Sequence, residues 1–192
     1  GQIVANEGGT ASEQELYNAF KDQVIALEQG GADALCIETM SSVIEASQAI
    51  RAAKENTNLP IICTFTFEPG ARGFRTMMGV DPSRAAQEAV AAGADIIGAN
   101  CGNGIADMIE ITKAMRATAP DMPILIHANA GMPIFENGRT VFKETPEAMA
   151  GYVAKLIAAG AGIIGGCCGT TPEHIAAIAE ALQGARSTFG KS

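Results

Sequence analysis

The sequence has little of what several classes of protein require. Its 192 residues include no Trp, two Tyr and two His, and only 18% of them are charged. Disordered chains combine low hydrophobicity with high charge, and a chain that is 47% hydrophobic does not fit that class. No run of about 18 apolar residues is free of charged residues, Gly and Pro, so no membrane-spanning segment is expected. Length and composition predict a globular protein of one domain or slightly more.

Positive charge and paired cysteines are also scarce. The 13 Lys and Arg oppose 21 Asp and Glu, and the resulting net charge of −8 repels phosphate groups, so neither nucleic acid nor a membrane surface is an expected partner. The five Cys are an odd number without a Cys-x-x-Cys pair, which argues against a disulfide framework and against a structural zinc knuckle. The first residues lack the basic start and apolar stretch of a secretory signal. We therefore expect a cytoplasmic protein.

Short β-branched apolar runs alternate along the chain with stretches of helical periodicity. Runs that are apolar throughout are typical of strands covered on both faces, which predicts a parallel sheet. Several helical stretches begin with a capping pattern, such as Ser12 followed by Glu15 or Ser42 followed by Glu45. The predicted strands are 32–38, 61–67, 94–100, 124–128 and 162–165, and the predicted helices are 12–29, 42–55, 82–92, 105–118, 146–159 and 172–182.

One short sequence motif recurs before three of the predicted strands. The segments that begin at Gly31, Gly93 and Gly160 each carry a glycine that ends a helix, then a small residue and an apolar strand. Such β/α repeats occur in open doubly wound sheets and in closed barrels. Because a closed barrel needs eight strands and typically about 250 residues, the strand count alone favours an open flavodoxin-like sheet.

In both architectures functional groups gather where the strands end. Cys101, Cys167 and Cys168 lie at such ends, whereas Cys36 and Cys63 lie within apolar strands and are expected in the core. Three thiols at one edge match a catalytic zinc site with three protein ligands and one open position. On spacing alone, packing of the adjacent thiols or a strained disulfide between them remains an alternative.

The glycine-rich segment 165–173 also fits a different kind of site. A glycine-rich turn that leads into a Thr-capped helix offers free backbone N–H groups, as a phosphate site does. Two adjacent thiols would be an unusual lining for such a site. A phosphate-binding β/α enzyme without a metal is therefore kept as the weaker alternative.

Other polar side chains at the strand ends are candidates for ligand contacts. Glu38 ends an apolar strand, where a carboxylate is costly without a partner, so it is either a solvated rim residue or a receptor for a substrate ammonium group. Asn100 and Asn129 are either turn residues or donors that hold metal ligands. His127 is expected in the core and His174 at the surface. Further candidates are Glu68, Asp81 and Glu136, and the lid-like loop 67–79 with Met77 and Met78.

The motifs at the strand ends together resemble those of one known family. Segment 165–175, which reads Gly-Gly-Cys-Cys-Gly-Thr-Thr-Pro-Glu-His-Ile, is similar to the closing motif of the homocysteine S-methyltransferase family. That family includes the homocysteine domain of cobalamin-dependent methionine synthase and betaine–homocysteine methyltransferase. Segments 35–40, 64–67, 97–101 and 129–133 resemble the family's fourth to seventh strands in the right order. The resemblance extends over residues 1–184 and looks most like the bacterial methionine synthase branch.

The resemblance implies a (β/α)8 TIM barrel instead of an open sheet. Residues 1–192 would be the C-terminal five-eighths of a homocysteine-binding domain, with strands 4–8 and their helices. Residues 1–9 would be the remnant of strand three and its loop. The first three strands, and the family's amino-acid-binding Asp-Gly-Ala-Met-Gly-Thr stretch, would be absent. Because such a piece exposes two sheet edges, a chain that completes the barrel is an expected partner.

The resemblance also implies a site and a reaction. Cys101, Cys167 and Cys168 would bind Zn²⁺, and the zinc-activated thiolate of homocysteine would attack a methyl donor to form methionine. Methylcobalamin on a separate corrinoid domain or protein is one such donor, and betaine or a sulfonium remains open. The alternatives are another small thiol as acceptor, or a non-catalytic zinc-binding subunit. The implied substrate-binding residues are Glu38, which would hold the ammonium group, with Thr66, Asn100 and Asn129.

Overall fold

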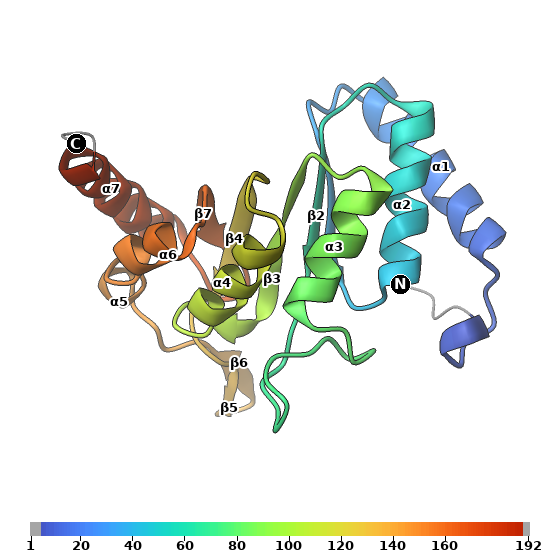
Figure 1. Cartoon of the computed structure of the whole chain (residues 1–192). Coiled ribbons are helices and arrows are strands. Elements are labelled where there is room, and N and C mark those ends of the chain that lie inside the picture. The colour runs from blue at the N-terminus through green and yellow to red at the C-terminus, as the bar shows by residue number, and fades with distance from the viewer. Residues whose placement is uncertain (1–4, 190–192) are drawn as a thin grey trace.

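Five parallel strands form one curved sheet, and helices pack against it (Figure 1). The computed structural model describes residues 5–189. The strands of the sheet are β1 (Leu35–Met40), β2 (Ile61–Phe65), β3 (Ile96–Gly104), β4 (Ile124–Asn129) and β7 (Ile163–Gly166). The helices are η1 (Ala5–Glu7), α1 (Glu13–Gln29), α2 (Val43–Asn56), α3 (Pro82–Ala92), α4 (Met108–Thr118), α5 (Pro146–Ala150), α6 (Val153–Ala159) and α7 (Pro172–Phe189).

The order of the strands decides between the two expected architectures. The sheet runs β1-β2-β3-β4-β7, so each strand lies beside the next parallel strand along the chain. A flavodoxin-like sheet has the order 2-1-3-4-5, because its chain reverses direction across the sheet. The open-sheet expectation from the strand count is therefore wrong. The sequential order agrees with part of a TIM barrel, as the resemblance implies.

The helix ends follow the capping signals in the sequence. The Ser12 and Glu15 side chains form a reciprocal capping box at the start of α1. The Asp81 side chain accepts a hydrogen bond from the backbone of Arg84 at the start of α3. Gly93 ends α3 in the left-handed conformation, where a glycine has no steric cost. These local signals explain why most predicted helix boundaries agree with the structure to within a few residues.

Three expectations about elements need correction. The predicted helix 146–159 is divided by a tight turn at Gly151 and Tyr152, whose ψ angles of −16° and −10° depart from regular helix. Helix α7 continues past residue 182 to Phe189. The prediction also missed the hairpin of β5 (Ile134–Glu136) and β6 (Arg139–Val141). Residues 1–9 were expected to be a remnant of strand three and its loop. Residues 1–4 lie outside the described residues, and η1 follows at Ala5–Glu7.

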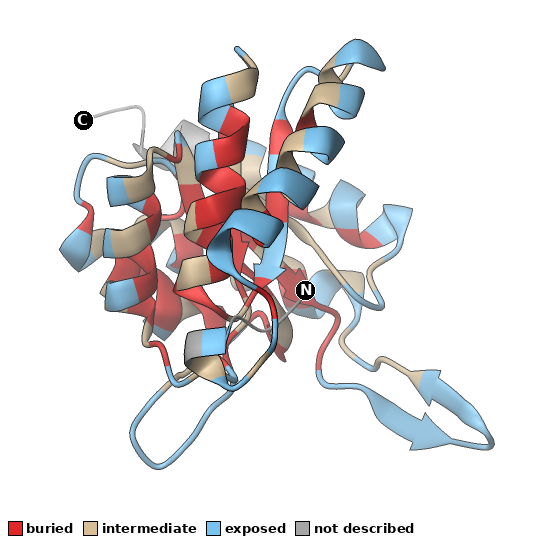
Figure 2. Cartoon of the chain, turned by 90° about the vertical axis from the view of Figure 1, so that its right-hand side faces the viewer, coloured by how far each residue is buried: buried red, intermediate tan, exposed pale blue. Residues whose placement is uncertain are grey.

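The main core lies between the sheet and the helices, and the other side of the sheet is exposed at its outer strands, at Cys36 in β1 and Ile163 in β7. Figure 2 shows the buried residues gathered in the strands and on the helix sides that face them. In β1, Leu35 and Ile37 are buried, whereas the alternate residues Cys36 and Glu38 are exposed. Cys63 in β2 is fully buried, as expected, but the prediction that Cys36 lies in the core is wrong. The error arose because the apolar run was taken to be covered on both faces. Nothing among residues 5–189 covers the face of β1 that carries Cys36. Within that range, no helix has the length and apolar character needed to cross a membrane.

Candidate metal centre

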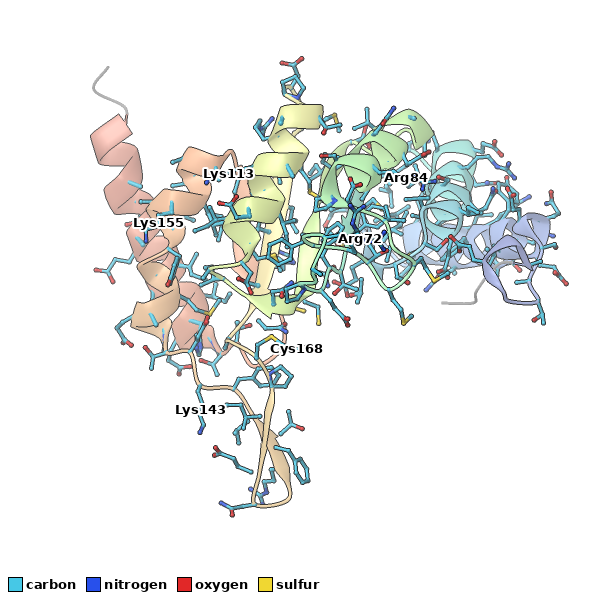
Figure 3. The ribbon with its side chains drawn as sticks, turned by 60° about the horizontal axis from the view of Figure 1, so that its bottom comes forward. Arg72, Arg84, Lys113, Lys143, Lys155 and Cys168 are labelled. Carbon is cyan, nitrogen blue, oxygen red and sulfur yellow. The ribbon has the colours of Figure 1, made fainter. Side chains whose placement is uncertain are left out.

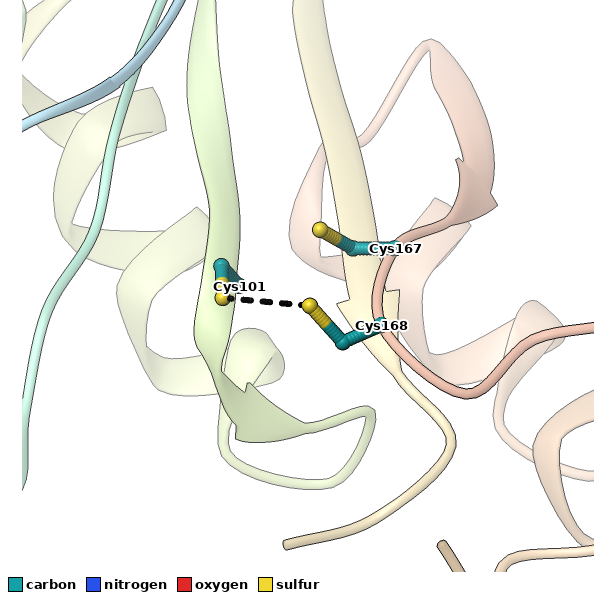
Figure 4. A group of neighbouring side chains, drawn as sticks. All are labelled: Cys101, Cys167 and Cys168. Atoms are coloured by element: carbon teal, nitrogen blue, oxygen red, sulfur yellow. Dashed lines mark hydrogen bonds between the residues drawn. The ribbon is translucent and has the colours of Figure 1, made fainter. Parts of the chain in front are cut away.

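Three cysteines converge where β3 and β7 end. The Sγ atoms of Cys101, Cys167 and Cys168 all lie within 4.8 Å of one another, and the Cys101 and Cys168 sulfurs are 3.8 Å apart (Figure 4). Cys101 and Cys167 are partly buried and Cys168 is exposed. Three soft sulfur donors in this range fit the ligand set of Zn²⁺.

A bulge in β3 turns Cys101 toward the other two thiols. Residues along a strand point alternately to opposite faces, so a regular β3 would direct Asn100 and Cys101 to opposite sides. Cys101 instead has a φ of 59°, and the pairing with β4 shifts register between Asn100 and Gly104. Gly102 follows at φ 70°, and a Cβ there would lie 2.5 Å from the Phe67 carbonyl oxygen. Bulges of this kind re-aim side chains beside functional sites.

The turn after β7 is fixed by its backbone. The Cys167 N–H donates to the Ala128 carbonyl at 2.8 Å, and the Cys168 N–H donates to Asn129 Oδ1 at 3.0 Å. The Thr170 N–H donates to the Cys167 carbonyl at 3.2 Å, and the next N–H donates to His174. Because these N–H groups already have partners within the chain, the geometry disfavours the phosphate-binding alternative.

The thiol of Cys168 is protonated at neutral pH in the metal-free chain. Desolvation by burial, the largest cause, and the neighbouring thiols of Cys101 and Cys167 together raise its pKa to about 11. A metal ligand must be the thiolate, so metal binding has to displace this proton.

A cavity of about 500 Å³ lies over the ends of β1 and β2. Glu38, Thr66 and Met77 are among its lining residues, with the carboxylates of Glu45 and Glu68. Thr66 lies close to the β3 bulge, since a Cβ on Gly102, the residue after Cys101, would lie 2.8 Å from its Oγ1. Two predicted candidates, Glu38 and Thr66, are thus brought to one acidic cavity, and Thr66 lies near the bulge that carries Cys101.

The remaining acidic candidates have local partners. Asp81 pairs with Arg75 at 2.7 Å and caps α3, and the backbone N–H of Arg84 is the main cause that lowers its pKa. Glu136 pairs with Lys143 on the hairpin. The backbone of Glu68 pairs with that of Arg75 on the lid-like loop. In that loop Met77 is exposed, whereas Met78 packs against the core.

The hairpin β5–β6 projects from the sheet beside the cysteine cluster. Figure 3 shows it extending away from the ribbon, with Cys168 near its base. Asn137 and Gly138 form its turn with φ angles of 50° and 76°. Asn-Gly is a strong signal for such a turn, and it could have been found in the sequence. Phe142, just after β6, packs so closely on Gly169 that a Cβ there would overlap its ring.

The two histidines differ from each other. His174 is 7% exposed, so the expectation of a surface residue is wrong. Its Nδ1 accepts the Thr171 N–H at 3.1 Å, and its Nε2 lies 2.9 Å from the Glu144 carbonyl, which fits a proton on Nε2. His127 is half-buried and its ring lies against Gly165. Burial lowers the pKa of His127, so its ring is neutral at pH 7.

The two asparagines are buried next to the cysteines. Asn129 accepts the Cys168 N–H, as described above. Asn100 contacts Thr39, Thr64 and Cys167. Both therefore support the strand ends that carry the thiols.

The fold and the geometry of the site define a class of protein: a partial β/α barrel with three thiols at its strand ends. The family model described as homocysteine S-methyltransferase matches residues 1–182. The chain therefore belongs to the homocysteine S-methyltransferase family. It is 28% identical over 176 residues to proteins named methionine synthase from Mycobacterium leprae and Mycobacterium tuberculosis. These alignments cover 87% of this chain and 14% of each relative.

Solved structures of other proteins share the fold of this chain. The apo form of the homocysteine methyltransferase MmuM from Escherichia coli matches with a TM-score of 0.72 at 21% identity, over 91% of this chain and 59% of that one. The carboxyl transferase domain of Rhizobium etli pyruvate carboxylase matches with a TM-score of 0.56 at 18% identity, over 90% of this chain and 32% of that one. At such identities the likeness concerns the fold alone.

Proposed function

We propose that this chain forms the thiol-activating part of a zinc-dependent homocysteine S-methyltransferase, which methylates the homocysteine thiol to form methionine. The observation that carries the proposal is the convergence of Cys101, Cys167 and Cys168, whose Sγ atoms lie within 4.8 Å of one another. Three protein thiols leave one zinc position for the thiol of a substrate. Family membership and the relatives named methionine synthase support homocysteine as that substrate.

The residues around the thiols fit a zinc ion. When bound, zinc would supply a Lewis acid that keeps a coordinated thiol in its thiolate form at neutral pH. The chain itself positions the three sulfurs: the β3 bulge directs Cys101, and the backbone contacts of the β7 turn hold Cys167 and Cys168. Preformed ligands of this kind lower the ordering cost of binding.

The acidic cavity supplies the second part of an amino-acid site. An α-ammonium group is a cation, and a carboxylate that accepts its hydrogen bonds holds it more strongly than a neutral acceptor does. Glu38 lines the cavity with its side chain exposed, so it is free to receive such a group. Thr66 lines the same cavity and would offer a hydroxyl to the same ligand.

The rest of the enzyme lies outside this chain in the proposal. The chain would carry strands four to eight of the homocysteine-binding barrel, and a further segment or a partner chain would cover the open side of the sheet. The sequential strand order and the exposed Cys36 and Glu38 support this arrangement. A methyl group on a corrinoid domain or protein, such as methylcobalamin, would be the donor, as the methionine synthase relatives favour. A cytoplasmic location fits this role.

Replacing Glu38 by Gln tests the substrate part of the proposal in the intact protein. We expect KM for homocysteine to rise about tenfold to a hundredfold, since a charged hydrogen bond is replaced by a neutral one. Steady-state kinetics with varied homocysteine measures this change. Glu136→Gln is the matched control, because Glu136 pairs with Lys143 on the hairpin, and its KM should stay as in the wild type. An unchanged KM in Glu38→Gln would show that this carboxylate does not bind the substrate.

A further inference from the structure

Asn100 joins three strands beneath the metal centre. It is 1% exposed and lies on β3, next to Cys101. Its Oδ1 accepts hydrogen bonds from the Thr39 N–H at 2.9 Å and the Thr64 hydroxyl at 2.7 Å. Its Nδ2 donates to the Thr39 hydroxyl at 2.7 Å and to Cys167 Sγ at 3.8 Å. The side chain thus reaches across β2 to β1 and, on its other side, to the turn after β7.

The contact with Thr39 falls on a second bulge. Thr39 has a φ of 62°, and the pairing of β1 with β2 shifts register between Ile37 and Met40. A left-handed conformation is costly for a β-branched residue and persists only where the surroundings hold it. Asn100 binds both the N–H and the hydroxyl of Thr39 and so helps to hold this conformation. The bulge immediately follows Glu38, the carboxylate that faces the acidic cavity.

The contact with Cys167 has a different chemical effect. An N–H group that donates to a thiolate stabilises its negative charge and fixes its direction, and partners of this kind tune metal affinity. Only a carboxamide offers two acceptor lone pairs for the Thr39 N–H and the Thr64 hydroxyl together with two donors on the opposite atom. A carboxylate of the same shape would keep the acceptors and lose both donors.

We propose that Asn100 is a positioning residue that ties the Cys167 thiolate to the Glu38–Thr39 bulge, so that the metal ligands and the ammonium-binding carboxylate keep a fixed relative position. The inference rests on the proposed zinc-dependent function. It assigns Asn100 an indirect part in substrate binding, because its polar atoms are engaged within the chain.

Asn100→Asp tests the inference in the intact protein, with zinc affinity measured by chelator competition. We expect affinity to fall by about tenfold to a hundredfold, the usual effect of losing a partner of a metal ligand. In the cobalt-substituted protein the sulfur-to-metal charge-transfer band should move to lower energy, because the thiolate loses its donor. Asn103→Asp is the matched control: Asn103 is a fully buried asparagine on the same strand, and its Nδ2 donates to the Phe67 carbonyl and not to a thiol. Its cobalt band should stay at the wild-type position.

Thr64→Val keeps the test decisive if Asn100→Asp fails to fold. This change removes one hydrogen bond to Asn100 Oδ1 in a buried site without touching a thiol, and we expect a smaller loss of zinc affinity, about threefold to tenfold. Unchanged affinity and an unchanged cobalt band in the folded variants would overturn the inference and leave the proposed function in place. A wild-type protein that binds no zinc would overturn both.

Discussion

Replacing Cys101 by Ala is expected to abolish stoichiometric zinc binding and to lower kcat/KM for methyl transfer to homocysteine by about a thousandfold. The alanine removes one of three clustered sulfur ligands and leaves two, which do not fix a zinc site. A bound metal ion contributes several kcal/mol of charge stabilisation, and about 1.4 kcal/mol corresponds to a factor of ten in rate. Metal analysis and a methyl-transfer assay on the same preparation measure the two effects.

Cys36→Ala is the matched control for that experiment. Cys36 is an exposed thiol on β1 that is not part of the cysteine cluster, so its loss should leave zinc content and rate as in the wild type. If Cys101→Ala retained both zinc and activity, the three-thiol site would not be the metal centre. If both variants lost zinc equally, a general effect of thiol removal would explain the result.

Replacing Gly98 by Ala is expected to lower the free energy of unfolding by about 3 kcal/mol, at the upper end of overpacking effects. Gly98 lies on β3 and pairs with Leu125 on β4. A Cβ at this position would overlap the backbone carbonyl of Leu125, which cannot move without disturbing the sheet. Denaturant unfolding followed by circular dichroism measures the change.

Gly162→Ala provides the control for Gly98→Ala. Gly162 lies directly before β7, its φ is not positive, and a Cβ there would contact only backbone atoms of Ile124 at 3.9 Å. That is an ordinary van der Waals distance, so the free energy of unfolding should change by less than about 1 kcal/mol. Equal destabilisation of the two variants would contradict the close approach of β3 and β4 at Gly98.

The helices and strands were predictable because their signals are local, and the cysteine cluster was predictable because it follows from the geometry of a parallel sheet. Capping residues such as Ser12 and Asp81 mark helix starts, and apolar runs mark strands. The carboxyl ends of parallel strands share one edge, so Cys101 and Cys167 could be placed together although they are 66 residues apart. The family resemblance then corrected the strand count, which alone favoured the wrong sheet.

The features that the sequence did not reveal depend on contacts distant along the chain. Cys101 reaches the other thiols through a left-handed bulge, a conformation that no local signal predicts for cysteine. His174 is buried because the Glu144 carbonyl, 30 residues away, binds its ring. Cys36 is exposed because nothing in the described chain covers that face of the sheet. The Asn-Gly turn of the hairpin differs from these, because its signal was present and was overlooked.

The zinc content and ligand set of the purified, reduced protein test the central claim most directly. We expect about one zinc per chain, with three sulfur ligands at about 2.3 Å in the X-ray absorption spectrum. Those sulfurs would belong to Cys101, Cys167 and Cys168, the three thiols that the fold brings within 4.8 Å of one another. A protein that takes up no zinc after reconstitution, or that binds zinc without sulfur ligands, would contradict the account.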